Sequence, residues 1–369
     1  MKLLVQPDDG ANPILTAINR AKKTLEVVVF RLDRKQIEEA IRAAAARGVF
    51  VRALVAFANR GGEQQLRRLE TRFLDSGVTV TRTSDDLVRY HAKMMIVDRK
   101  ILYVLSYNFT TLDVEHSRGF GIVTRNKMLV QEAARLFESD TKRQPYTPQL
   151  SNFLVSPLNA RKQLAEYIAN ARKELLIYDP KISDSQMVRL LTDRQKAGVE
   201  VRILGRLGKK AGELDARRMG TVRLHTRTIV RDRKDAFVGS QSLRKLELDS
   251  RRELGLIVKE RNVIAKLIET FESDWATNKD KELKGDKELK GKLADKDHEK
   301  PAKKMQLEKK LDPLGETIKR AVKKAVKENG HEVIADDETK ETLKQAVKKT
   351  VKQAFKEAVE ETAARVEDA

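Results

Sequence analysis

The sequence predicts an α/β protein built from two copies of one folding unit, followed by a helical tail. Three observations predict this class: helix-like and strand-like segments alternate, the same succession of segments occurs twice, and the composition changes sharply near residue 276. Alternating amphipathic helices and apolar strands are typical of sheets whose faces are covered by helices. The copies occupy residues 1–145 and 151–276, and a segment with Pro145 and Pro148 joins them.

Each copy opens with an amphipathic helix that runs into an apolar strand, and a second helix and strand follow. These stretches keep a fixed offset of 150, so that Ile18 matches Ile168 and Ala21 matches Ala171. The matched stretches are residues 17–30 with 167–178, and residues 47–52 with 197–202. Such self-similarity is the signature of a duplicated structural unit.

A block of strands in the second half of each copy is matched over a longer stretch. The second copy is 16 residues shorter before this block, and the offset is then fixed at 134 from His91 to Gly121. The matched positions include His91 with His225, Asp98 with Asp232, Ser106 with Ser240, and Gly121 with Gly255. Each block predicts two strands joined by a tight turn, and helices at residues 128–138 and 263–275 close the copies.

The sequence changes character after Trp275, where lysine replaces arginine as the main basic residue. Residues 277–312 include a six-residue repeat and predict a low-complexity, charged, solvated linker. Residues 313–369 predict a tail of two amphipathic helices, at about 316–328 and 337–365. The apolar face of the longer helix favours a packing or oligomer contact, and its lysine-rich face also suits an anionic membrane surface.

The formal net charge of +20 lies mostly in the two copies. Residues 1–276 hold 51 basic against 34 acidic side chains, a balance of +17. A positive field attracts polyanions such as nucleic acid, anionic lipid head groups or phosphorylated molecules, although a basic surface also serves solubility alone.

Composition also excludes some classes of protein. The chain has no cysteine, so it has neither disulfides nor thiolate chemistry. No stretch approaches about 18 uninterrupted apolar residues, and the opening apolar run is too short for a signal peptide. We therefore expect a cytoplasmic protein without a transmembrane segment, attached at most to a membrane surface.

Each strand block begins with a histidine and a cation at positions i and i+2. The pairs are His91 with Lys93 and His225 with Arg227. Residues i and i+2 of a strand point to the same face, so each imidazole projects beside a fixed positive charge. Such a pair suits a phosphate, because the cation holds its oxygens while the imidazole reaches phosphorus. Further phosphate-binding hydrogen bonds are expected from side chains at the strand ends, namely Ser106, Asn108 and Ser240.

Over roughly residues 1–276 the chain resembles the phospholipase D superfamily, whose mark is a duplicated HxKxxxxD motif followed by GSxN. The residues that carry the resemblance are His91, Lys93, Asp98, Ser106 and Asn108 in the first copy, and His225, Arg227, Asp232 and Ser240 in the second. The resemblance implies two α/β repeats packed about a pseudo-two-fold axis, with both motifs at one shared site.

The resemblance also implies covalent catalysis without a metal ion or another cofactor. One histidine attacks phosphorus to form a phosphohistidine, and the other protonates the leaving alcohol and then activates water or an acceptor alcohol. We assign His91 as the nucleophile and His225 as the acid and base, and the reverse assignment stays open. Asp98 and Asp232 are expected to be structural, since each lies at a strand turn.

The chain departs from the superfamily pattern in both copies. Arg227 replaces the lysine of the second motif, Ser242 replaces its asparagine, and Leu105 replaces the glycine of the first. Arginine keeps the charge but is a planar fork, so the phosphate geometry must change.

The acidic residues expected to orient the histidines also depart from the superfamily pattern. The superfamily commonly has an acidic residue downstream of each motif, and Glu253, 28 residues after His225, fits this role. The position equally spaced from His91 is Gly119, and Glu115 is the nearest substitute.

Three functions follow as hypotheses. The first is a phospholipase D-like phosphodiesterase or phosphatidyl transferase acting on phospholipid, near the cardiolipin synthase-like bacterial members. The second is a metal-independent nuclease of the same superfamily, which the arginine-rich copies favour but the aromatic content of 5% disfavours. The third is a catalytically inactive protein that binds phosphate or anionic lipid, in view of the departures above.

Overall fold

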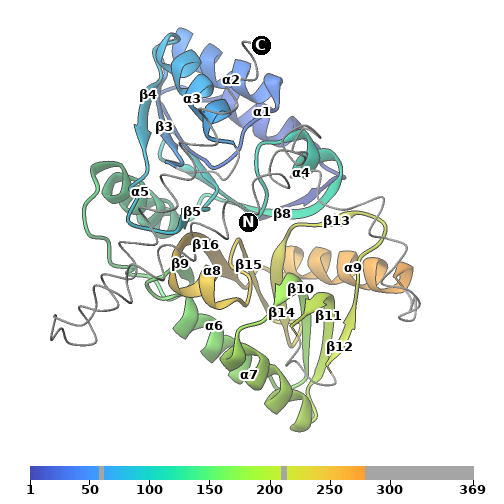
Figure 1. The fold of residues 1–369 in the computed structure, drawn as a ribbon. Coiled ribbons are helices and arrows are strands. Elements are labelled where there is room, and N and C mark those ends of the chain that lie inside the picture. The colour runs from blue at the N-terminus through green and yellow to red at the C-terminus, as the bar shows by residue number, and fades with distance from the viewer. Residues whose placement is uncertain (58–61, 209–213, 279–369) are drawn as a thin grey trace, which may run out of the picture. The chain divides into compact units, whose positions relative to one another are not determined.

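The computed structural model describes residues 1–57, 62–208 and 214–278 (Figure 1). These ranges hold two α/β repeats, which confirms the predicted fold class for this part of the chain. The predicted linker (277–312) and helical tail (313–369) lie outside the described residues, apart from residues 277 and 278. No helix within the described ranges is long and apolar enough to cross a membrane.

The first repeat is a mixed sheet with five helices. Its strands are β1 (Lys2–Gln6), β2 (Thr24–Val29), β3 (Phe50–Val55), β4 (Thr79–Arg82), β6 (Met94–Val97), β7 (Ile101–Leu105) and β8 (Ser117–Thr124). Its helices are α1 (Asn12–Asn19), α2 (Lys35–Ala46), α3 (Glu63–Leu74), α4 (Thr111–Glu115) and α5 (Lys127–Lys142). The strand order is β1-β8-β7-β6-β2-β3-β4, with β2, β3 and β4 parallel and the other neighbours antiparallel.

The second repeat has the same design. Its strands are β9 (Phe153–Ser156), β10 (Glu174–Ile182), β11 (Glu200–Leu207), β12 (Asp215–Arg217), β14 (Arg227–Arg231), β15 (Asp235–Gly239) and β16 (Arg251–Val258). Its helices are α6 (Ala160–Ala169), α7 (Ser185–Lys196), α8 (Lys245–Asp249) and α9 (Arg261–Thr277). The strand order is β12-β11-β10-β14-β15-β16, and β9 pairs with the far side of β16.

Local sequence accounts for these elements. In α2 the buried residues Ile37, Ala40, Ile41 and Ala44 follow helical spacing, so one face of the helix packs on the sheet. The strand β2 instead buries consecutive residues on both faces, as expected for a central strand that is covered on each side.

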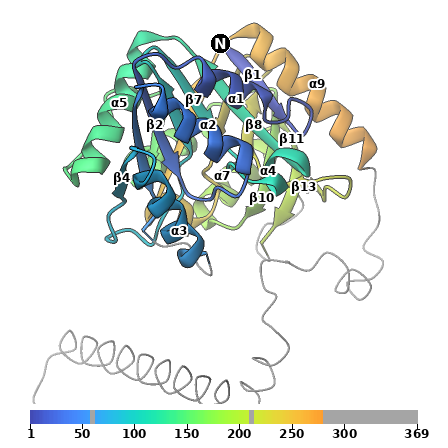
Figure 2. The ribbon, with the colours of Figure 1, turned by 90° about the horizontal axis from the view of Figure 1, so that it is seen from above.

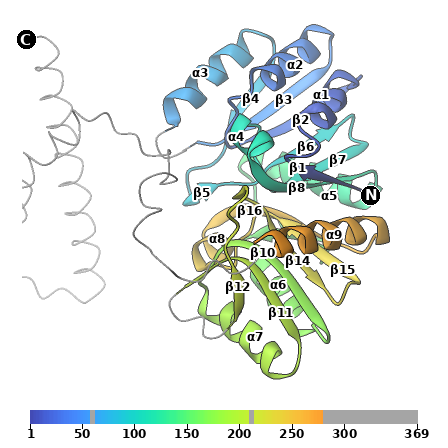
Figure 3. The ribbon, with the colours of Figure 1, turned by 90° about the vertical axis from the view of Figure 1, so that its right-hand side faces the viewer.

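The helices and sheets form layers around three apolar clusters. Helices α1, α2 and α3 cover the outer face of the first sheet, and α6 and α7 cover the outer face of the second (Figure 3). The third cluster lies between the sheets and includes Phe120 and Val104 of the first repeat with Tyr178 and Val238 of the second. Helices α5 and α9 contribute to this shared cluster from opposite sides (Figure 2).

Each repeat also contributes one short strand that pairs with the other repeat. Strand β5 (Arg89–Tyr90) of the first repeat pairs in parallel with β16, and β13 (Arg223–Leu224) of the second pairs in parallel with β8. The paired positions are Arg89 with Arg251, Tyr90 with Arg252, Arg223 with Ser117, and Leu224 with Arg118. All four positions of one exchange map onto the other at the offset of 134, which is the pseudo-two-fold relation expected between the repeats.

Two ion pairs on buried aspartates join the repeats in the same reciprocal way. Arg118 of β8 makes two hydrogen bonds, of 2.8 and 2.9 Å, to the carboxylate of Asp274 in α9. Arg252 of β16 donates a 3.0 Å hydrogen bond to Asp140 in α5. Each aspartate also accepts a 2.7 Å hydrogen bond from a tyrosine hydroxyl, Tyr178 for Asp274 and Tyr90 for Asp140.

We predict that Arg118→Ala lowers the free energy of unfolding by roughly 3–5 kcal/mol, because it leaves the buried Asp274 carboxylate without its partner. Urea denaturation followed by circular dichroism measures the change. Arg189→Ala is the matched control, since Arg189 and Asp193 form an exposed pair at 3.8 Å and its loss should cost less than about 1 kcal/mol. Equal effects of the two substitutions would contradict the prediction.

Candidate active site

The two motif histidines follow directly on the exchanged strands. His91 comes after β5, and its backbone N–H donates a 2.7 Å hydrogen bond to the carbonyl of Arg252 in the other repeat. His225 comes after β13, and its N–H donates at 3.1 Å to the carbonyl of Arg118. Both imidazoles are buried, and the exchange therefore fixes each histidine against the opposite repeat.

The two cations lie beside the histidines in matching ways. Lys93 Nζ donates a 2.7 Å hydrogen bond to the carbonyl of His91, and Arg227 Nη1 donates a 2.6 Å hydrogen bond to the carbonyl of His225. Lys93 also lies 5.5 Å from the ring centre of Phe30, whose ring meets His91 edge-on at 4.7 Å. Phe30 is thus an aromatic wall of the site that the motif did not predict.

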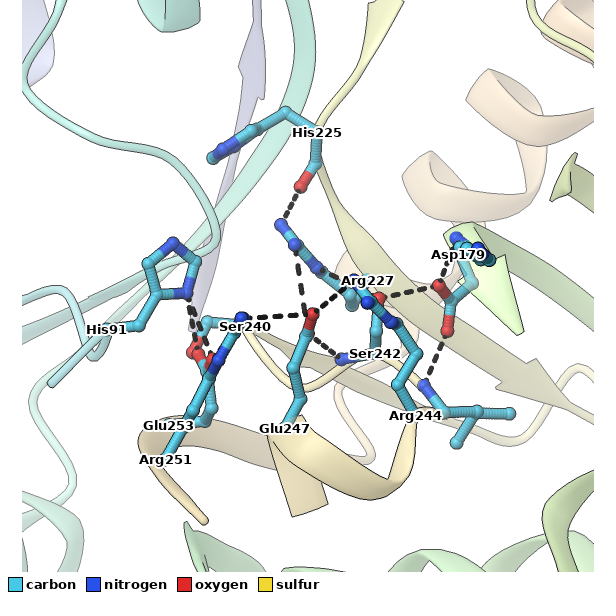
Figure 4. Close-up of polar contacts among 12 residues, drawn as sticks. His91, Asp179, His225, Arg227, Ser240, Ser242, Arg244, Glu247, Arg251 and Glu253 are labelled. Atoms are coloured by element: carbon cyan, nitrogen blue, oxygen red, sulfur yellow. Dashed lines mark hydrogen bonds and ion pairs between the residues drawn. The ribbon is translucent and has the colours of Figure 1, made fainter. Parts of the chain in front are cut away.

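Glu253 orients the histidine of the opposite repeat. Its carboxylate oxygens lie 2.9 and 3.1 Å from Nδ1 of His91 (Figure 4). The spacing in the sequence had linked Glu253 with His225, but the exchange of strands brings it to His91 instead. A carboxylate that accepts a hydrogen bond from Nδ1–H leaves the lone pair on Nε2 of His91 available.

His225 has a different environment. No described residue hydrogen-bonds its Nδ1, and the position that matches Glu253 is Gly119, where an added Cβ would lie 2.9 Å from the ring of Tyr107. The nearest acidic oxygen is Oδ2 of Asp113 in α4, 3.6 Å from Nε2. Glu115, the nearest acidic residue in the sequence to Gly119, forms an ion pair with Arg34 at 2.5 Å.

The charges of the two motifs act on each other across the repeats. Burial lowers the pKa of His91 well below its usual value, and the charges of Lys93 and Arg227 lower it further. Burial also lowers the pKa of His225, where Arg227 and Lys93 act in the same direction and Asp113 opposes them. The cation of each motif thus lowers the pKa of the histidine in the other motif, so the two motifs lie close together at one site.

Lys93 is fully buried, and burial lowers its pKa to about 7. Glu253 and Asp113 oppose this shift, whereas Arg227 adds to it. Its charge therefore titrates close to neutral pH, because the loss of hydration outweighs the attraction of the neighbouring carboxylates.

Three polar residues had been predicted to bind phosphate. The hydroxyl of Ser106 accepts a 2.9 Å hydrogen bond from the backbone of Phe120, and that of Ser240 accepts one of 3.1 Å from Leu254. Both side chains are completely buried and tie neighbouring strands together. Asn108 Nδ2 donates a 2.7 Å hydrogen bond to Asp113, so its amide holds the carboxylate beside His225.

Asp98 and Asp232 lie at the opposite ends of the motif strands. Asp98 accepts hydrogen bonds from three successive backbone N–H groups, those of residues 22, 23 and 24, and Asp232 accepts from those of residues 172, 173 and 174. Both have positive φ angles of 52°. These contacts hold the turn that precedes a central strand in each repeat, in keeping with a structural part.

Sequence reasoning missed three acidic residues of the site, Asp113, Glu247 and Asp179. A signal for the first two was present, because the offset of 134 places Asp113 on Glu247, five residues after Asn108 and Ser242 respectively. Asp179 corresponds to Val29, so no repeated pattern marks it. Within the described ranges, no group of three or more histidine and acidic side chains is arranged to hold a metal ion.

Comparison with known proteins places both repeats in one family. The family described as "Cardiolipin synthase, PLD-like domain" matches residues 14–141 and 164–275. The mitochondrial cardiolipin hydrolase of Mus musculus is 27% identical over 154 residues, which cover 40% of this chain and 66% of that protein. The protein of the same name from Canis lupus familiaris is 29% identical over 139 residues, covering 37% of this chain and 50% of its own length.

Solved structures share the fold across both repeats. A polyphosphate kinase from Porphyromonas gingivalis superposes with a TM-score of 0.62 at 19% identity, covering 74% of this chain and 50% of the kinase. A phosphatidylserine synthase from Haemophilus influenzae gives a TM-score of 0.57 at 12% identity, covering 75% and 86%. At these identities the likeness concerns the fold alone.

We predict that the affinity for sulfate, a phosphate-shaped anion, falls as the pH rises above about 7, because Lys93 then loses its charge. A single proton taken up on binding gives a change of about tenfold per pH unit. Calorimetric titration between about pH 6 and pH 8.5 measures the slope. Lys93→Arg should flatten it, since arginine stays charged over this range, and an equal slope in both proteins would rule out Lys93 as its source.

Proposed function

The chain belongs to the family of the cardiolipin synthase, PLD-like domain, and on this premise we propose that it cleaves a phospholipid phosphodiester, as a hydrolase or a phosphatidyl transferase. The observation that carries the proposal is the hydrogen bond from His91 to Glu253 of the other repeat, beside two cations that act on both histidines. The curated relatives are named cardiolipin hydrolases, which supports a phospholipid as the substrate.

In the proposed first step, Nε2 of His91 attacks phosphorus, and the bond from phosphorus to the leaving oxygen breaks. Glu253 supports this step because it accepts a hydrogen bond from Nδ1–H and stabilises the positive charge that the ring acquires. Lys93 and Arg227 stabilise the negative charge on the non-bridging oxygens. The leaving oxygen takes a proton from His225.

In the proposed second step, His225 removes a proton from water or from an acceptor alcohol. The resulting oxygen attacks the phosphohistidine, the nitrogen–phosphorus bond breaks, and His91 is released. Water gives hydrolysis and an alcohol gives transfer. Asp113 serves His225 in both steps, because its carboxylate at 3.6 Å favours the protonated ring.

The basic surface is relevant to the substrate as well. The balance of +17 in residues 1–276 suits an anionic membrane surface, and we propose that the protein reaches its lipid there. The same charge favours a second candidate function, metal-independent cleavage of nucleic acid, because a positive field does not distinguish between polyanions.

The proposal predicts head-group release from phosphatidylglycerol or cardiolipin vesicles in the presence of a chelator, with no nicking of plasmid DNA in parallel. His91→Ala and His225→Ala should each lower the initial rate by at least about a hundredfold. Glu115→Gln is the control, because Glu115 is bound to Arg34 away from the imidazoles.

The other outcomes of this assay are equally informative. Nicked DNA without lipid turnover would establish the nuclease. Lipid binding without turnover of either substrate would establish a binding protein, and full activity of both histidine variants would refute the mechanism.

A second prediction separates the roles of the two histidines. With bis(4-nitrophenyl) phosphate the leaving phenolate is stable without a proton, so His225→Ala should still release one equivalent of nitrophenol per protein and accumulate the covalent intermediate. His91→Ala should show no such burst. Stopped-flow absorbance measures it, and a burst confined to His91→Ala would reverse the assignment.

A further inference from the structure

The second half of the site is built differently from the first at four matched positions. The pairs, first repeat before second, are Lys93 and Arg227, Asn108 and Ser242, Asp113 and Glu247, and Val29 and Asp179. Since Val29 pairs with Val55 and Asp179 with Gly205, the strand register confirms that the last two positions are equivalent. The four replacements are in contact with one another.

Three groups hold the guanidinium of Arg227. Nη1 donates to the carbonyl of His225 at 2.6 Å, Nη2 lies 3.8 Å from Glu247, and Nε donates to the hydroxyl of Ser242 at 3.4 Å (Figure 4). The lysine of the first repeat shares only the first of these anchors, the carbonyl of its own histidine. A planar fork needs several anchors because its orientation decides what it can bind.

The hydroxyl of Ser242 connects the guanidinium of Arg227 to the carboxylate of Asp179. Ser242 Oγ lies 2.7 Å from Oδ1 of Asp179. The carboxylate also accepts from the backbone N–H groups of Lys181, at 2.9 Å, and Leu243, at 2.7 Å. A hydroxyl has one proton, and since it is donated to Asp179, the oxygen faces Arg227 as an acceptor.

Asp179 is held in place by the backbone around it. Its side chain is 2% exposed, and no apolar substitute could satisfy the donors that point at it. The β10 backbone bends here, and its register with β11 shifts between Asp179 and Ile182. Only glycine fits opposite the bend, because a Cβ at Gly205 would lie 1.8 Å from the Asp179 carbonyl oxygen.

The side chains next to the arginine differ in length from their counterparts in the first repeat. Serine is shorter than the asparagine that it replaces, and Glu247 is one methylene longer than Asp113. Accordingly, Asn108 reaches Asp113 through its amide as well as its backbone N–H, whereas Ser242 meets Glu247 through the backbone N–H alone, at 2.9 Å. The departures from the superfamily pattern in the second motif thus compensate one another.

We propose that Asp179 and Ser242 are positioning residues that fix the plane of Arg227, so that its fork grips both non-bridging oxygens of the substrate phosphate. Hydrogen bonds to Ser242 and to the His225 carbonyl use the Nε–H and one N–H of Nη1, and Glu247 faces Nη2 as an ion pair, so N–H groups on both terminal nitrogens are left for an anion. The proposal rests on the proposed function for the identity of the anion as a phosphodiester. The anion-binding geometry itself is independent of turnover.

The test is a double-mutant cycle between Ser242 and Arg227. Ser242→Ala removes the relay but leaves Asp179 its two backbone donors, so the fold is retained. It should weaken sulfate binding and lower kcat/KM for bis(4-nitrophenyl) phosphate by about tenfold in the natural protein. In the Arg227→Ala background the same substitution should have almost no effect, because there is no guanidinium left to orient.

Thr228→Val is the matched control. Thr228 is as buried as Ser242 and is adjacent to Arg227 in the chain, but its hydroxyl bonds only Thr226, at 3.0 Å. Its effect should be the same with and without Arg227. An effect of Ser242→Ala that is equally large in both backgrounds would overturn the proposal and leave Ser242 a general structural part.

A rescue experiment provides the second measurement. Arg227→Lys alone should weaken sulfate binding, because a lysine does not fill the place built for a fork. Adding Ser242→Asn and Glu247→Asp gives the second half-site the first repeat's residues at three of the four positions and should restore most of the loss, whereas no restoration would contradict the compensation. If sulfate coupling is found but no phosphodiester is turned over, the proposed function fails while this inference stands.

Discussion

The site depends on the reciprocal exchange of one short strand between the repeats. Because β5 pairs with β16 and β13 pairs with β8, the backbone of each motif histidine is hydrogen-bonded to the opposite repeat. The ion pair between Arg118 and the buried Asp274 joins β8 to helix α9 of the opposite repeat. The position of each histidine is therefore set by contacts with the opposite repeat, and the site is made by both repeats together.

The two repeats share one fold, but the halves of the site that they contribute have different side chains. The first has a lysine and a histidine whose Nδ1 is held by Glu253, which suits a nucleophile that must present Nε2 in one orientation. The second has an arginine held on three sides and a histidine whose Nδ1 has no partner in the described chain. In the proposed reaction one imidazole attacks phosphorus and the other donates and accepts protons. The different surroundings of the two histidines match these different roles.

The sequence was sufficient to predict what the duplication repeats. A constant offset identified both histidines, both cations and the two turn aspartates without any knowledge of the fold. It did not reveal which repeat Glu253 serves, because the exchange of strands is a property of tertiary packing. The sequence did not predict Asp179 and Phe30 for another reason. Their counterparts at the offset of 150 are Val29 and Pro180, so a comparison of the two copies finds no shared residue at these positions.

The charges around the two histidines have a consequence for the proposed mechanism. Burial and neighbouring cations hold the pKa of both histidines and of Lys93 low. A phosphate entering between them reverses the electrostatic balance, since a nearby anion favours every protonated form. On the proposed mechanism, Glu253 holds His91 with Nε2 aimed at phosphorus, whereas Asp113 favours the protonated ring of His225. Binding of the substrate thus favours protonation of the acid, and a neutral nucleophile and a protonated acid can coexist in one small site.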